Sequence, residues 1–230
     1  MKGVNRGDAE MAKAAAEAAA AAGVTLDTLD AIQLDALREV GNIGAGTAAA
    51  SLSSMTGQPV AMGVPSVKIM PIERVPEEVG GDESIVVAVY LQVIGDAPGH
   101  IVFILQADTA RELCDTLMGG MDAGRPGPTG FSDMQISALQ EIGNIMTGSY
   151  LRALADLTRL HLEPMPPALG IDMAAALISS VVAEVARTVD LALIIETQFE
   201  DDATPSIGYF AFIPEPEALG VVLKGLGLIA

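Results

Sequence analysis

Apolar residues recur every three or four positions over residues 26–55, with polar residues between them. This spacing predicts one long amphipathic helix. Asp27 and Thr25 are the two candidates for its N-cap, because their side chains accept hydrogen bonds from the first helical turn. Gly57 follows the last apolar position and is expected to end the helix.

Segments rich in valine and isoleucine come next, and they are typical of strands. Pro65 falls inside the first of them, which places that strand at an edge or a bulge. A further helix with Asp108 as its expected N-cap precedes a stretch rich in glycine and proline. The expected elements are a strand at 60–70, a short helix or loop at 71–79, a hairpin at 84–94 and 100–106, a helix at 107–118 and a linker near 119–130.

The second half of the chain repeats this order of elements. We expect a long helix at 132–159, an extended stretch at 161–169, a helix at 173–187, strands at 189–199 and 206–213, and a final helix at 215–224. Amphipathic helices need a sheet to cover, and strands joined by short turns pair antiparallel. The predicted fold class is α+β, an internally duplicated pseudo-twofold domain with long helices on a largely antiparallel sheet, and some parallel pairing stays compatible with the pattern.

Domain boundaries follow from this repeat. Residues 1–24 form an alanine-rich N-terminal extension, 25–119 the first repeat, 120–131 a linker and 132–230 the second repeat. We expect the two repeats to fold together as one pseudo-twofold domain.

Both predicted long helices carry the same polar stripe. Residues at positions i, i+4 and i+7 of a helix lie close to one line, so three such polar residues form a stripe about two turns long. The first copy is Asp35, Glu39 and Asn42, followed after 22 residues by Pro65. The second copy, 102 residues later, is Ser137, Glu141, Asn144 and Pro167.

An exposed glutamate and asparagine are by themselves common on a helix surface. Their retention in both copies favours a function, because asparagine is a poor helix former and nothing local requires it. Gly41, Gly44 and Gly46 add a second conflict, since each glycine in a helix costs about 1 kcal/mol relative to alanine. Close approach of a partner and tight packing against the other repeat explain these glycines equally well.

Composition excludes several classes of function. The formal charge is −18, from 30 acidic and 12 basic residues, which opposes binding to phosphodiester backbones and to anionic membrane surfaces. No apolar run is long enough to span a bilayer. The single cysteine and the lack of a signal peptide at the start of the chain favour a cytoplasmic location.

Other candidates for chemistry are weak. His100 and His161 are isolated, and Cys114 lies on an ordinary amphipathic helix, so we expect no metal site and no nucleophile among them. The glycine run at 41–46 is not a phosphate loop or a dinucleotide-binding motif, because no strand precedes it and no Lys-Ser or Lys-Thr follows it.

The duplicated stripe resembles the motif of the CheC-type chemotaxis phosphatases (the CheC/CheX/FliY family), which is Asp or Ser, three residues, Glu, two residues, Asn, 22 residues and Pro. The resemblance covers about residues 26–225, and two complete motifs are similar to the CheC branch. It implies hydrolysis of the phospho-aspartate of the response regulator CheY, without a bound cofactor, since the Mg²⁺ belongs to the receiver domain of the substrate.

The same resemblance implies a role for each motif position. Glu39 and Glu141 would dock against a lysine of the receiver, and Asn42 and Asn144 would orient the attacking water. The supporting positions are Asp35, Ser137, Pro65 and Pro167. Two rival functions stay open: a non-catalytic binding module like the FliM middle domain of the flagellar switch, and an adaptor that binds the receptor deamidase CheD.

Overall fold

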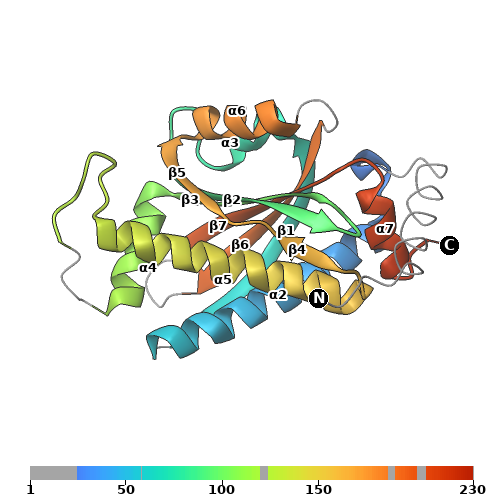
Figure 1. Cartoon of the computed structure of the whole chain (residues 1–230), viewed down its shortest axis with the longest axis horizontal. Helices are drawn as coiled ribbons and strands as arrows, with labels where there is room; N and C mark the ends of the chain where they lie inside the picture. The colour runs from blue at the N-terminus through green and yellow to red at the C-terminus, as the bar shows by residue number, and fades with distance from the viewer. Residues whose placement is uncertain (1–24, 58, 120–123, 186–189, 201–205, 230) are drawn as a thin grey trace, which may run out of the picture.

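An antiparallel sheet of seven strands separates two layers of helices in the part of the chain that the computed structural model describes (Figure 1). The described residues are 25–57, 59–119, 124–185, 190–200 and 206–229. The predicted extension at 1–24 and part of the predicted linker, 120–123, lie outside them. The predicted α+β class with an antiparallel sheet is confirmed, because every strand pairing described is antiparallel.

The elements follow the order that the sequence predicts. In the first repeat they are η1 (Leu26–Thr28), α2 (Ala31–Thr56), β1 (Ala61–Pro71), η2 (Ile72–Arg74), α3 (Val75–Glu78), β2 (Ile85–Gly95), β3 (Gly99–Gln106) and α4 (Ala107–Met118). In the second repeat they are α5 (Asp133–Thr158), β4 (Leu162–Pro164), β5 (Ala168–Met173), α6 (Ala174–Val185), β6 (Leu191–Glu200), β7 (Ser206–Pro214) and α7 (Ala218–Gly225).

The predicted helix caps need two corrections. Asp30 caps α2, with its Oδ1 accepting a hydrogen bond from Gln33 N at 2.8 Å, so Asp27 and Thr25 are wrong as caps of this helix. Asp27 lies in the short turn η1, and Thr25 precedes that turn. Asp108 is also wrong as the cap of α4, because it lies inside the first turn and pairs with Arg111.

The strand order is β1-β6-β7-β3-β2-β4, with β5 also paired to β2. The edge strand β1 of the first repeat therefore pairs with β6 of the second, and β4 and β5 of the second repeat pair with β2 of the first. Pro65 lies where the register of β1 shifts between Gly63 and Ser66, as the sequence predicts for a strand containing proline. The two repeats thus exchange their first strands across one sheet.

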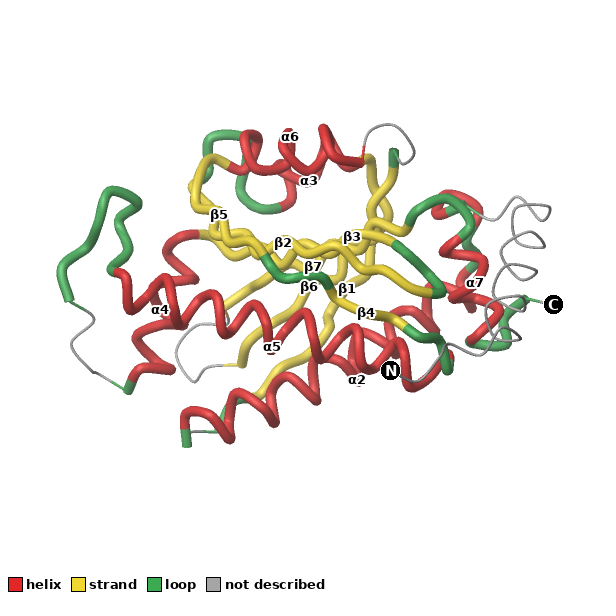
Figure 2. Tube along the Cα trace, viewed as in Figure 1, coloured by secondary structure: helices red, strands yellow, loops and turns green. Residues whose placement is uncertain are grey.

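The helices α2 and α5 lie side by side on one face of the sheet and run in opposite directions, while α3 and α6 cover the other face (Figures 1 and 2). The helices α4 and α7 close the two ends (Figure 1). The larger core fills the space between α2, α5 and the sheet, and its most completely buried side chains include Phe103, Phe131, Leu52, Leu139, Ile142 and Met146.

Three helix glycines allow unusually close packing. A Cβ at Gly44 would lie 2.9 Å from Cα of Tyr150, so α2 and α5 cross backbone to backbone at this point. A Cβ at Gly41 would lie 3.2 Å from Ile195 of the sheet, and a Cβ at Gly143 would lie 2.4 Å from Val89. The copies of the motif glycine therefore set the distance between each long helix and the sheet.

Two other helix glycines have no such role. A Cβ at Gly46 or at Gly148, its counterpart 102 residues later, would meet nothing within 4 Å. Packing on the other repeat therefore explains Gly41 and Gly44 but not Gly46.

We expect Gly143→Ala to destabilise the protein by about 1–3 kcal/mol, because the added methyl group overlaps Val89. The matched control on the same helix is Gly148→Ala, which removes a helix glycine without adding a contact and should stabilise the fold by about 1 kcal/mol. Urea unfolding of the two variants and the parent measures both effects. Equal stability of Gly143→Ala and the parent would contradict the packing described here.

Candidate active site

The first copy of the motif lies on the outer side of α2. Asp35, Glu39 and Asn42 are exposed, whereas the neighbouring Val40 and Gly41 are buried toward the sheet. Because Gly41 packs directly on the sheet and lies two residues after Glu39, the glutamate points to the opposite side of the helix. The local sequence Glu-Val-Gly-Asn therefore presents the carboxylate and the amide to solvent on a rigid support.

The second copy has the same arrangement on α5. Ser137, Glu141 and Asn144 are exposed, and Ile142 and Gly143 between them are buried. The Ser137 hydroxyl donates a hydrogen bond to the carbonyl of Asp133 at 3.0 Å, which ties it to its own helix.

The four predicted catalytic side chains are available to a partner. Within the described residues, no hydrogen bond or ion pair engages the side chains of Glu39, Asn42, Glu141 or Asn144. The carboxylates of Glu39 and Glu141 and the amides of Asn42 and Asn144 therefore lie at matching positions on the neighbouring helices. No contact within the described part of the protein accounts for them.

The stripe is longer at both ends than the motif alone indicates. Ile32 begins it on α2 with 71% of its surface exposed, and Met134 begins it on α5 with 50% exposed. Gly46 and Gly148 end the two stripes. The spacing 32, 35, 39, 42 and 46 keeps these positions on one helix face, and the second copy repeats it. The two exposed apolar residues were not predicted, and their matching positions in the repeat are the signal that identifies them.

Each motif proline follows its helix in the chain, one inside a strand and the other between two strands. Pro65 belongs to β1, and Pro167, which is half-buried, lies between β4 and β5. Each marks a break in an edge strand next to its helix. Val64, beside Pro65, also lies 3.6 Å from the Cβ position at Gly41, so this break is part of the surface on which α2 rests.

The other residues considered for chemistry are His100, Cys114 and His161. His100 Nδ1 shares a hydrogen bond of 2.8 Å with the Tyr90 hydroxyl, and burial lowers the pKa of His100. Cys114 is buried, which raises the pKa of its thiol to about 11, so it is protonated at neutral pH and a poor nucleophile. His161 is exposed, and its backbone N donates to Asp96 Oδ2 at 2.7 Å.

The described residues offer no candidate metal site and no candidate membrane span. They contain no group of three or more His, Cys, Asp or Glu side chains placed to hold a metal ion. No helix in this part of the chain is long and apolar enough to cross a membrane.

Comparison with known proteins gives matches in both sequence and structure. The CheC-like family matches residues 32–69 and 134–171, which contain the two stripes. The CheY-P phosphatase CheC of Bacillus subtilis (strain 168) is 36% identical over 171 residues, or 74% of this chain and 81% of that protein.

Solved structures agree on the fold. Thermotoga maritima FliY has a TM-score of 0.69 at 21% identity, with 87% of this chain and 98% of that chain covered. The FliM middle domain of H. pylori has a TM-score of 0.60 at 15% identity, with 86% and 99% covered. At these identities the two structures support the architecture alone. The extent and identity of the match to the B. subtilis protein decide the family, and the chain belongs to the CheC-like family.

Proposed function

We propose that this protein is a phosphatase that hydrolyses the phospho-aspartate of a CheY-type receiver in the cytoplasm. The observation that carries the proposal is the duplicated stripe, in which an exposed carboxylate and an exposed amide stand three residues apart on each of two helices. The name of the B. subtilis relative, a CheY-P phosphatase, supports the same reaction.

The reaction demands little of the enzyme. The phosphoryl group on an aspartate is an acyl phosphate, and the Mg²⁺ that neutralises its charge belongs to the receiver, so the enzyme needs no cofactor of its own. Water attacks the phosphorus in line, the bond from phosphorus to the aspartyl oxygen breaks, and the aspartate leaves as a carboxylate with inorganic phosphate as the other product. The remaining requirement is to hold the water in position.

Asn42 and Asn144 are proposed to hold that water. An amide oxygen accepts a hydrogen bond from water, and the amide NH₂ can donate to a phosphoryl oxygen at the same time. Both amides are exposed on helices whose backbones are fixed by contact with the sheet, which limits the positions the water can take. A general base is unnecessary because the leaving group is already a good one.

Glu39 and Glu141 are proposed to dock the receiver through a lysine in its active site. A carboxylate paired with an ammonium forms a charge-assisted hydrogen bond, which fixes orientation as well as affinity. Asp35 and Ser137 lie one turn earlier on the same stripes and are proposed to contact the receiver, while Pro65 and Pro167 are proposed to fix the backbone of the extended segments beside the two helices.

Gly46 and Gly148 are proposed to let the receiver approach the helix closely. Neither glycine has a packing partner that would explain it, and both continue the stripe beyond the asparagine. Ile32 and Met134, at the other end, are proposed as apolar contacts, because an exposed large apolar side chain becomes favourable when a partner covers it.

A purely binding function, like that of a flagellar-switch module, is compatible with the fold but does not account for the amides of Asn42 and Asn144. An apolar or charged surface would suffice for binding, whereas a paired Glu and Asn occur in both repeats. Binding to the deamidase CheD is compatible with catalysis and stays a prediction, which a pull-down with purified CheD tests.

The double variant Asn42→Ala with Asn144→Ala should release phosphate from the phosphorylated receiver about 100-fold more slowly, because the water is no longer oriented. Each single variant should keep the activity of the intact site. Asp156→Ala, which removes an exposed polar side chain near the other end of α5, is the control and should keep full activity. Full activity in the double variant would exclude the proposed mechanism.

Replacing both glutamates, Glu39→Gln with Glu141→Gln, should weaken receiver binding about tenfold, because the amide removes the charge from the hydrogen bond. Titration of the receiver by fluorescence anisotropy, with turnover measured in parallel, separates affinity from catalysis. Asp156→Asn, an exposed acid near the other end of α5, controls for the loss of general negative charge. Slower turnover with unchanged affinity would assign the glutamates to the chemistry and contradict the docking role.

Bulky substitutions at the glycines, Gly46→Gln with Gly148→Gln, should leave the fold intact but slow phosphate release at least about tenfold, because the side chains separate the receiver from the stripe. The space around both positions is open, so the variants should unfold at the same urea concentration as the parent or a higher one. Alanine at both positions is the size control. Unchanged activity in the glutamine variants would show that the receiver does not approach this end of the helices.

A further inference from the structure

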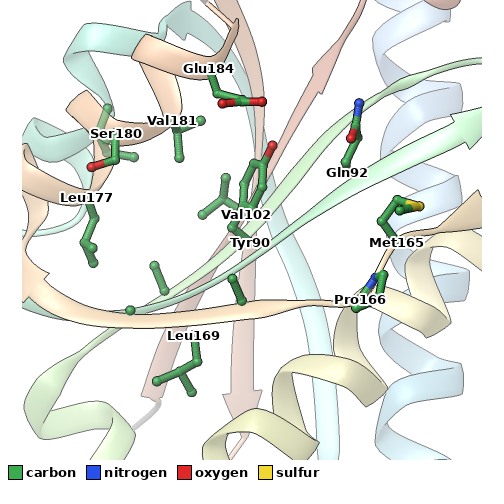
Figure 3. Close-up of a pocket in the computed structure, with 14 residues that line it drawn as sticks. Tyr90, Gln92, Val102, Met165, Pro166, Leu169, Leu177, Ser180, Val181 and Glu184 are labelled. Carbon is green, nitrogen blue, oxygen red and sulfur yellow. The ribbon is translucent and has the colours of Figure 1, made fainter.

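A pocket of about 520 Å³ lies on the sheet face opposite the two stripes, beneath α6 (Figure 3). Its floor is formed by β2 and β3, and one side is formed by β5 and the segment before it. The size falls within the range of small-molecule sites. Ala88, Val102, Leu177 and Val181 give most of it an apolar lining.

One end of the pocket is polar and acidic. Figure 3 shows the Glu184 carboxylate and the Tyr90 hydroxyl at the same end, with the Gln92 amide nearby. Glu184 makes no hydrogen bond or ion pair with the described residues, and no described residue that lines the pocket is a lysine or arginine. The lining therefore offers a negative charge at one end and an apolar wall along the rest.

The other repeat has a lysine at the position that corresponds to Gly170. Gly170, which lines the pocket, lies 102 residues after Lys68, and Ser180, which also lines it, lies 102 residues after Glu78. In the first repeat, Lys68 and Glu78 form an ion pair on this same face of the sheet.

The groups around Lys68 show which chemistry surrounds an ammonium group at this position. Glu196 and Tyr209 both raise the pKa of Lys68 electrostatically, after the larger effect of its hydrogen bond with Glu78. An aliphatic chain that ends in an ammonium group thus lies among carboxylates and a phenol. In the second repeat, Leu177 packs against Gly170, where a Cβ would lie 2.9 Å from it, and the rest of this volume is open, with the phenol of Tyr90 and the carboxylate of Glu184 beside it.

We propose that this pocket binds a small organic amine, a primary ammonium on an aliphatic chain of about the four carbons of a lysine side chain. The ammonium pairs with Glu184 beside the Tyr90 hydroxyl, and the chain lies along Val102, Val181 and Leu177. The site is separate from the phosphatase stripes and does not depend on the function proposed for them.

The probe is n-pentylammonium, with 1-pentanol and pentanoate as neutral and anionic analogues of the same length. Met165 lines the pocket, so NMR of protein with ¹³C-labelled methionine methyl groups follows binding at this position. We expect saturable shifts of the Met165 signal with the amine, binding about tenfold weaker with the alcohol, and none with the acid.

Two variants test the site itself. Glu184→Gln should remove the tenfold preference for the amine over the alcohol, whereas Glu163→Gln, an exposed acid on β4 that does not line the pocket, should keep it. Gly170→Lys places in the pocket the residue that the first repeat has, and should abolish binding of the amine.

A thermal unfolding curve establishes that each variant is folded. If Gly170→Lys does not fold, the comparison of Glu184→Gln with Glu163→Gln still decides. Equal binding of the amine, the alcohol and the acid, or an amine preference that persists in Glu184→Gln, would overturn the proposal.

Discussion

The contact between each long helix and the sheet is the constraint on which the rest of the structure depends. Gly41 and Gly143 have no side chain, and the space that a Cβ would need is taken by Ile195 and Val89. Any larger residue would lift the helix or shift the strand. Because the glycine lies two residues after the motif glutamate, the same contact that buries one side of the helix turns the glutamate to the other side. The contact at this glycine therefore both packs the helix on the sheet and exposes the motif glutamate.

The exchange of strands makes each site depend on both repeats. Gly41 of the first repeat rests on Ile195 of the second, and Gly143 of the second rests on Val89 of the first. At the helix crossing, Tyr150 packs on Gly44, stacks on Phe210 with ring centroids 4.2 Å apart, and shares a hydrogen bond of 2.7 Å with Thr197. A repeat isolated from its mate would lose the floor under its own helix, which gives a physical reason for the duplicated chain to fold as a unit.

The sequence predicts the order of the elements well, because periodicity and turn residues act locally. The helix start was missed by a few residues because the cap depends on which turn precedes the helix, and η1 moves that role to Asp30. The polar stripe follows from spacing alone. The different packing of the glycines does not, because it depends on distances in the folded protein. A Cβ at Gly44 would lie 2.9 Å from Tyr150, whereas a Cβ at Gly46 would meet nothing within 4 Å. Ile32 and Met134 were missed because an apolar residue in an amphipathic helix is normally assigned to the core.

The two faces of the sheet differ in how closely the two repeats match. On the helix face the glutamate and asparagine occur in both repeats. On the other face Lys68 and Glu78 correspond to Gly170 and Ser180. Both members of the ion pair in the first repeat are therefore uncharged residues in the second. In the second repeat, Leu177 fills part of the space beside Gly170, because a Cβ on this glycine would lie only 2.9 Å from Leu177. The described residues that line the resulting pocket therefore include a carboxylate, that of Glu184, but no lysine or arginine to balance its charge.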